Sequence, residues 1–254
     1  MNLVFRGIRA EGLKLKNTLA LRMAVIAPGL VVALMSLQLM VMDHSKRSPA
    51  PMEAAWLTYA EGVIGLWTFL MLPLYITLQA SLLAGLEHQN RQWKYLLALP
   101  VPRHSHFTSK ALVLMLMVLL ATLSLILLIP FGGWLLGAVQ PNSGLAGWPP
   151  LWAIAKPALA TVPACLLMAM VQTWVALRWS SFTVAVSIGM SATVAGFLIG
   201  QSERFGHWYP WSMPLWTMAG DARFLPLVLA SSLGLGLLAL ALGAWLFSRR
   251  DPES

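Results

Sequence analysis

Residues 111–137 read ALVLMLMVLLATLSLILLIPFGGWLLG, and this stretch decides the class of fold. It contains no charged residue and exceeds the roughly 20 helical residues that cross about 30 Å of hydrocarbon. A lipid-facing strand would be shorter and would alternate apolar with polar residues. The run therefore predicts a helix that crosses a membrane.

Five further apolar runs flank this one between polar breaks. The six predicted spans cover residues 23–42, 58–84, 111–137, 153–177, 182–200 and 224–247. The chain of 254 residues is 58% hydrophobic and only 10% charged, whereas about a quarter of the residues of a soluble domain carry charge. These values predict a single all-helical membrane domain over residues 1–254, so the net charge of +8 does not indicate a nucleic-acid partner.

The positions of the cations predict the orientation, because Lys and Arg in short connections are retained on the cytoplasmic side. With both termini inside, most cations become cytoplasmic: Arg6, Arg9, Lys14, Lys16, Arg22, Arg91, Lys94, Arg103, Lys110, Arg178, Arg249 and Arg250. The outer set is Lys46, Arg47, Lys156, Arg204 and Arg223. We therefore expect an N-in, C-in protein.

Two segments outside the predicted spans have distinctive sequences. Residues 1–22 separate apolar side chains from cations on two helical sides, which predicts an interfacial helix on the anionic inner surface. The apolar side holds Val4, Ile8 and Leu15, and the basic side holds Arg6, Arg9 and Lys16. The alternative is a disordered basic tail. Residues 201–223 contain Pro210 and Pro214 among aromatics and predict a short re-entrant outer element. Kinks are expected at prolines inside spans, namely Pro28, Pro73, Pro130 and Pro163.

The sequence lacks the motifs for nucleotide binding, disulfide bonds and metal sites. A phosphate-binding Walker loop needs Lys followed by Ser or Thr, and none of the lysines is so followed. The single cysteine, Cys165, excludes a disulfide framework and a multi-cysteine metal site. No His-Glu-x-x-His pattern occurs. We expect no catalytic, metal or cofactor-binding residue in this chain, which is not an enzyme by itself.

Polar residues form a stripe along the second predicted span. Glu61, Gly65, Thr68, Leu72, Tyr75 and Gln79 follow one another at steps of three or four, which places them on one side of a helix. Because polar groups in hydrocarbon face protein or a water-filled cavity, the polar members Glu61, Thr68, Tyr75 and Gln79 are candidates for a pathway lining or a subunit contact. The alternative places Glu61 in the outer headgroup region and makes the others ordinary buried partners.

The fifth predicted span carries small residues at steps of four. They are Thr183, Ser187, Ser191 and Ala195, followed by Gly196 and Gly200. Small residues permit close contact between membrane helices. We favour packing within the subunit over a seam between two subunits.

The connection between the second and third spans reads EHQNRQWKYLLALPVPR over residues 87–103, and Lys110 follows. It contains an acidic residue at the end of the second span, then Trp-Lys before Leu-Leu-x-Leu-Pro, then Arg and a later Lys. With six spans and a basic N-terminal segment, this pattern resembles the ABC-2 type permeases. The likeness extends to the subgroup associated with lantibiotic immunity and bacitracin resistance.

The resemblance implies a permease that dimerises, with itself or with a related permease, in the bacterial cytoplasmic membrane. It implies two copies of a separate ABC ATPase, which would bind ATP and Mg²⁺. Residues 87–103 would then be a coupling helix that contacts the ATPase. The implied coupling residues are Glu87, Arg91, Trp93, Lys94, Leu97 and Arg103. The alternative is an interfacial loop whose Trp93 anchors in lipid headgroups.

The leading functional prediction is the permease subunit of an ATP-driven exporter. Its subgroup likeness implies an amphiphilic substrate, either a peptide antibiotic or a lipid-like molecule, taken from the cytoplasm or the inner leaflet. A channel or ion-coupled carrier working without ATP is the alternative, although Glu61 is the one plausible acidic candidate within a predicted span. A non-transporting scaffold or sensor is the third class.

Overall fold

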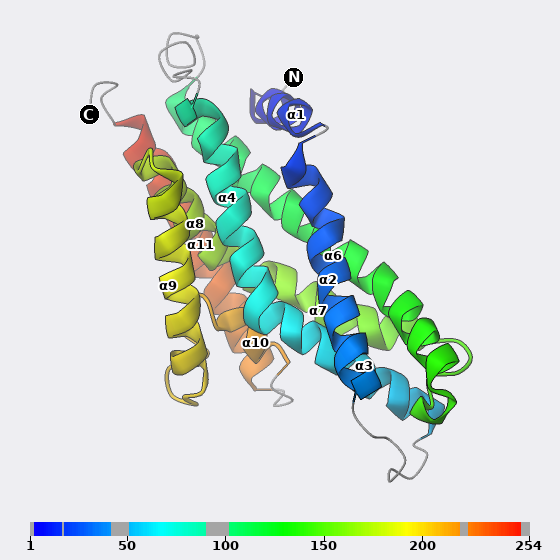
Figure 1. Ribbon diagram of the computed structural model, residues 1–254. Coiled ribbons are helices and arrows are strands. Elements are labelled where there is room, and N and C mark those ends of the chain that lie inside the picture. Colours follow the sequence, from blue (N-terminus) through cyan, green and yellow to red (C-terminus); the bar gives the residue numbers. More distant parts are fainter. Residues whose placement is uncertain (1–2, 17, 42–50, 90–101, 219–222, 250–254) are drawn as a thin grey trace.

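The computed structural model describes residues 3–16, 18–41, 51–89, 102–218 and 223–249 (Figure 1). Every regular element in these ranges is helical, as predicted. The α-helices are α1 (Leu3–Leu15), α2 (Leu19–Val41), α3 (Met52–Leu66), α4 (Leu72–Gln89), α6 (Arg103–Val139), α7 (Leu151–Ala164), α8 (Leu166–Arg178), α9 (Phe182–Gly200), α10 (Met213–Trp216) and α11 (Phe224–Ser248). A π-helical turn, η1 (Trp67–Met71), joins α3 to α4, and a 3₁₀ turn, η2 (Pro141–Ser143), follows α6.

Among the described residues, five helices are long and apolar enough to cross a membrane, or six if α7 and α8 form one bent span. They overlap all six predicted spans, which confirms a multi-pass helical membrane protein. The first three spans start earlier than predicted, and the second starts at Met52 rather than at residue 58. The first starts at Leu19, so Arg22 lies inside α2, and the third belongs to a helix that starts at Arg103.

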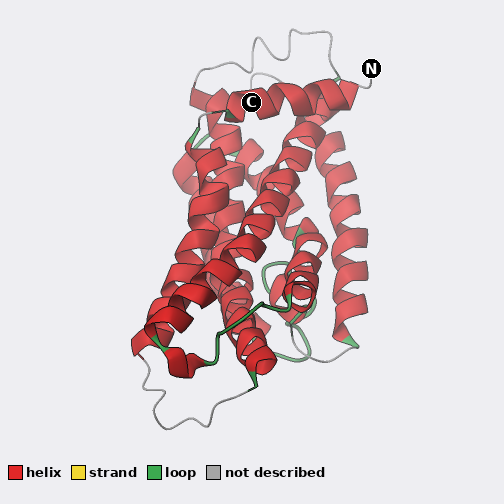
Figure 2. Ribbon diagram, turned by 90° about the vertical axis from the view of Figure 1, so that its right-hand side faces the viewer, coloured by secondary structure: helices red, strands yellow, loops and turns green. Residues whose placement is uncertain are grey.

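Helix α1 lies across one end of the bundle, and α11 ends at that same end (Figures 1 and 2). Exposed tryptophans occur at both ends of the bundle. Trp174, Trp179 and Trp245 lie towards the α1 end, and Trp134, Trp148, Trp152 and Trp208 towards the other. The start of α1 and the end of α11 lie at the same end, which an N-in, C-in protein requires, and the orientation itself stays a prediction.

The fourth span is broken where a kink was expected. Helices α7 and α8 meet at Cys165 with a bend of 44°, two residues after Pro163. Ser232 of α11 fills the break: its Oγ lies 2.8 Å from the carbonyl oxygen of Ala164 and accepts the amide of Leu167 at 3.4 Å. A backbone break inside a membrane is tolerated where protein groups satisfy it, and one hydroxyl on α11 does so here.

The second span is continuous but contains the π-helical turn just before Pro73. Proline has no backbone N–H to donate to the carbonyl four residues earlier. The amide of Leu72, the residue before Pro73, bonds to the carbonyl of Trp67, five residues back. Such single π turns accommodate a local irregularity without ending the helix. Pro28 and Pro130 likewise lie inside continuous helices, α2 and α6.

The turns between α9 and α10 fold back along α9, and the re-entry of residues 201–223 into the membrane stays a prediction. Tyr209 donates its hydroxyl to the carbonyl of Ala192 at 3.0 Å. Gly196 and Gly200 permit this approach, because a Cβ at Gly196 would lie 2.9 Å from Cβ of Trp211. The element lies at the end of the bundle away from α1 (Figure 1).

The predicted packing face of α9 is wrong for part of its length. Thr183, Ser187 and Ser191 are exposed, whereas Gly189 is buried against Thr77 of α4. Residues two positions apart point about 200° apart around a helix. The sequence offered two faces of small residues, and the chain packs the face that contains Gly189.

Candidate functional site

Three helices meet around one ammonium group at the α1 end of the bundle. Lys110 of α6 donates from Nζ to Oε2 of Glu11 in α1 at 3.0 Å. The same Nζ donates to the carbonyl oxygen of Leu83 in α4 at 2.8 Å. Lys14 donates to the other carboxylate oxygen of Glu11 at 2.8 Å. We call Glu11, Lys14 and Lys110 the ionic junction.

The central pair of the ionic junction is buried. The side chains of Lys110 and Glu11 are only 3% and 7% exposed, whereas Lys14 is 34% exposed. Burial raises the pKa of Glu11, but the charges and hydrogen bonds of Lys110 and Lys14 outweigh it and hold the pKa below its ordinary value of 4.5. Glu11 is therefore an ionised carboxylate at neutral pH, with a partner for each oxygen.

One face of α1 is shaped to reach this position. Gly7, Glu11 and Leu15 follow one another at steps of four and line one side of the helix. A Cβ at Gly7 would lie 3.0 Å from Cβ of Ser109, so glycine lets α1 approach α6 closely. Leu15 is buried at the end of the same face. This face fixes the position of α1 on α6.

Glu11 was not among the residues predicted from the sequence, although a signal was present. It is the only acidic residue in the first 22 positions, and it lies on the side assigned to Ile8 and Leu15. A carboxylate on the apolar side of a basic helix requires a cationic partner. Lys110 was noted as part of the motif, but not as that partner.

The ionic junction holds the two helices that carry the predicted coupling segment. Leu83 is about one turn before Glu87 in α4, and Lys110 is about two turns after the start of α6 at Arg103. The backbones of Glu87 and Arg103 lie in those helices, and their side chains are outside the described set. Arg91, Trp93, Lys94 and Leu97 lie outside the described residues.

Three members of the polar stripe pack between helices. Tyr75 donates to the carbonyl of Met117 in α6 at 3.2 Å, and Gln79 donates to the carbonyl of Ala20 in α2 at 2.7 Å. Thr68 is buried and bonds to its own helix at Ile64, 2.9 Å away. Glu61 is exposed and separate from these three. In this conformation the stripe joins the second span to its neighbours.

Two apolar hollows open at the end away from α1. One has a volume of about 600 Å³ and is lined by Leu198, Phe205, Trp208 and Tyr209, among others. The second, of about 470 Å³, lies among Phe131, Trp134, Trp148 and Trp152. Both present aromatic walls with few polar groups, which suit apolar or amphiphilic molecules.

These features define a class: a multi-pass helical membrane protein whose polar groups join helices. Within the described ranges, no three His, Cys, Asp or Glu residues are grouped to hold a metal ion.

The chain belongs to the ABC-2 transporter family. The family described as ABC-2 family transporter protein matches residues 7–196, a range that includes the ionic junction, the polar stripe and the predicted coupling segment. None of the curated proteins compared with the sequence matches it. The family makes this chain a transporter membrane subunit, and it confirms the resemblance at family level.

Proposed function

We propose that this chain is the permease subunit of an ATP-driven exporter whose ATPase is a separate chain. The observation that carries the proposal is the ionic junction. It ties α1, α4 and α6 together beside the segment that the ATPase would contact. A push on residues 87–103 would move these three helices as one unit.

In the proposed transporter, the ATPase and the permease have different roles. The ATPase, in two copies, binds ATP and Mg²⁺, and the permease converts its closure into movement of helices. The proposed contact residues are Glu87, Arg91, Trp93, Lys94, Leu97 and Arg103. Because the positive charges concentrate at the α1 end, that end faces the cytoplasm of a bacterial cell in this proposal.

The proposed substrate is amphiphilic, either a peptide antibiotic or a lipid-like molecule, as the subgroup likeness implies. The apolar hollows at the far end support this class. The proposed route follows Thr68, Tyr75 and Gln79, and it opens when α4 separates from α2, which the ionic junction does not hold. Oε1 of Gln79 supports this route, because it is buried without a hydrogen-bond partner among the described residues and would gain one from entering water.

A second permease subunit completes the proposed transporter. The exposed stripe of Thr183, Ser187 and Ser191 on α9 supports a seam there, since small residues permit close helix contact in lipid. The flanking side chains of Val184, Met190 and Val194 are apolar and exposed. The subunits form a homodimer or a pair of related permeases.

A carrier driven by an ion gradient is the alternative function. Such carriers use carboxylates within the membrane. The described geometry gives this alternative little support, because Glu61 is exposed and contacts none of the stripe residues through a hydrogen bond. Glu11 lies on the interfacial helix and is neutralised by two lysines.

Co-expression with a partner ABC ATPase from the same organism tests the proposal. The purified complex should hydrolyse ATP and export substrate from vesicles, and the permease alone should hydrolyse none. Replacing Glu87 or Arg91 by Gln should weaken the complex or its coupling while leaving membrane insertion intact. Undiminished export after deletion of the ATPase would refute the proposal.

Orientation has its own test. In a Cys165→Ala background, a cysteine replacing Asn142 should react with an impermeant thiol reagent applied to intact cells. A cysteine at Ser254 should react only after the cells are opened. The reverse result would place the α1 end outside.

A further inference from the structure

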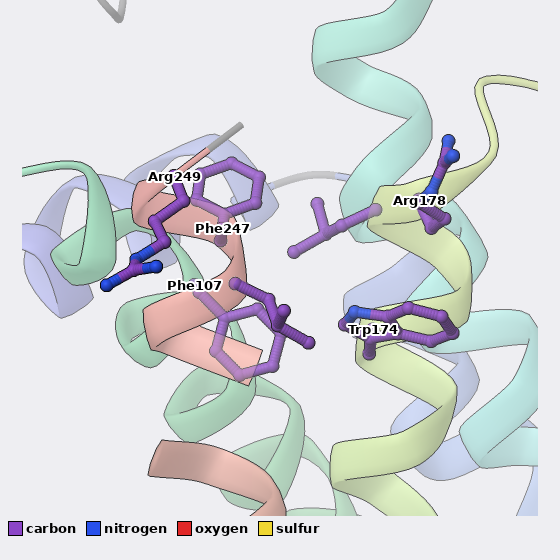
Figure 3. A pocket seen from close by; sticks show the side chains of 7 residues that line it. Phe107, Trp174, Arg178, Phe247 and Arg249 are labelled. Atoms are coloured by element: carbon purple, nitrogen blue, oxygen red, sulfur yellow. The ribbon is translucent and has the colours of Figure 1, made fainter. Parts of the chain in front are cut away.

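A separate pocket of about 330 Å³ opens at the α1 end of the bundle (Figure 3). Trp174 and Arg178 of α8 form one side, and Phe247 and Arg249 at the end of α11 form the other. Phe107 of α6 lies between them. None of these residues belongs to the ionic junction, the polar stripe or the predicted coupling segment.

The inner wall of the pocket is aromatic, and its side chains are closely packed. Phe107 is fully buried, and its ring lies against the backbone of α11 at Gly243. A Cβ at Gly243 would collide with that ring, so glycine keeps Phe107 in this position. Trp174 faces it from α8 (Figure 3).

The rim of the pocket is cationic. The guanidinium of Arg249 lies 4.1 Å from the ring centroid of Trp245, and that of Arg178 lies 5.9 Å from the ring centroid of Trp179. Such cation–π contacts hold a guanidinium beside a ring that prefers the membrane interface. Both arginines are exposed, so they remain accessible from the headgroup region.

The aromatic inner wall and the cationic rim of the pocket together match one kind of ligand. A guanidinium forms paired hydrogen bonds with phosphate oxygens, and the aromatic wall fits the upper part of an acyl chain. Basic pockets between spans are suited to acidic lipid headgroups. We propose that this pocket binds an anionic phospholipid of the leaflet on the α1 side, with its headgroup at the rim to which Arg178 and Arg249 contribute positive charge.

The test measures retention of phosphatidylglycerol and phosphatidylcholine by the full-length chain, using native mass spectrometry. The wild-type protein should retain phosphatidylglycerol in preference to phosphatidylcholine. Arg178→Gln combined with Arg249→Gln should lower its affinity by about 30-fold, because each cation near a membrane surface contributes roughly fivefold. Affinity for phosphatidylcholine should change by less than about twofold.

The matched control removes the same charge from the same end of the molecule. Arg9 and Arg22 are exposed there but do not line the pocket. Arg9→Gln combined with Arg22→Gln should leave phosphatidylglycerol binding within about twofold of wild type. An equal loss in both double variants would show a diffuse attraction to the basic surface and would overturn the proposed site.

A second pair of variants keeps every charge. Leu246 lines the pocket and is 46% exposed, so Leu246→Trp should fill the pocket and reduce phosphatidylglycerol retention severalfold. Leu242 lies one turn earlier, is 50% exposed and does not line the pocket, so Leu242→Trp should have no effect. Equal retention by both tryptophan variants would also overturn the proposal.

Discussion

The molecule buries polar side chains in two different ways. At the α1 end, the ionic junction uses full charges and joins three helices at one ammonium group. Along the second span, Tyr75 and Gln79 are neutral and each reaches one backbone carbonyl on a neighbouring helix. Breaking a buried ion pair costs about 3–5 kcal/mol, whereas a neutral hydrogen bond contributes roughly 0.5–1.5 kcal/mol.

This difference indicates which contacts persist when the bundle moves. Helices joined by the ionic junction stay together, because separating them would leave a buried charge without a partner. The contact of α4 with α2, which the neutral hydrogen bond of Gln79 to Ala20 joins, separates at smaller cost. We infer that force enters at the rigid α1 end and that the bundle opens along the second span.

The largest expected effect comes from breaking the ionic junction on one side. Lys110→Met leaves Glu11 buried with only Lys14 as its partner among the described residues. We expect a loss of about 3–5 kcal/mol in unfolding free energy, measured by denaturant titration in detergent. Lys14→Met is the control and should cost less than about 1 kcal/mol, since Lys14 is 34% exposed.

A double variant distinguishes the cost of an unpaired charge from the cost of altered packing. Glu11→Leu with Lys110→Met replaces the pair with apolar groups, which is often nearly neutral for stability. It should recover most of the loss caused by Lys110→Met alone. A double variant as unstable as Lys110→Met would show that the cost came from packing rather than from an unpaired charge.

The next effect concerns the close contact of α1 with α6. Gly7→Leu forces a side chain against Ser109 and should cost about 1–3 kcal/mol, because overpacking displaces neighbours. A Cβ at Gly12 would meet no atom within 4 Å, so Gly12→Leu should be neutral or slightly stabilising. Thermal unfolding of the two variants provides the comparison, and similar melting temperatures would argue against a close α1–α6 contact.

A smaller effect is expected on the second span. Tyr75→Phe removes the hydrogen bond to Met117 and should cost about 1 kcal/mol by the same denaturant titration. If the contact of α4 with α2 opens during transport, cysteines at Thr68 and Gln79 should react with small aqueous reagents only during ATP turnover. A cysteine at Leu70, which is exposed on another side of the span, should stay unreactive. Reactivity that never depends on nucleotide would mean that the stripe is packing alone.

The smallest effect is a dependence on pH. Because the pKa of Glu11 is lowered on folding, its contribution to stability is complete above pH 4.5 and is lost as the pH falls through the folded-state pKa. Burial opposes the attraction of the lysines, which keeps the net effect small. Glu11→Gln should remove this part of the acid sensitivity. Stability curves from pH 6 to pH 3 that are parallel for both proteins would contradict the assignment.

Sequence periodicity predicted the spans because each is an uninterrupted apolar run, of which 111–137 is the plainest. It placed the start of the third span too late, because His104, Ser105 and Thr108 look like loop residues although they form the first turns of α6. Such polar residues are compatible with the part of a spanning helix that extends beyond the hydrocarbon.

The sites depend on contacts that no local pattern contains. Glu11 and Lys110 are 99 positions apart, so their pairing follows from how the helices pack. The packing face of α9 could not be chosen either, since small residues occur on both of its sides. The motif at residues 87–103 was recognisable because its chemistry is contiguous, and the family match includes it.

The bond from Ser232 to the broken fourth span has a consequence for biosynthesis. Ser232 follows Leu167 by 65 positions and lies beyond the family match at residues 7–196. At roughly 5–20 residues per second, the ribosome completes α11 several seconds after the fourth span has been made. During that interval the break between α7 and α8 lacks its hydroxyl. The break in the fourth span therefore gains its hydrogen-bond partner from Ser232 only when the last helix arrives.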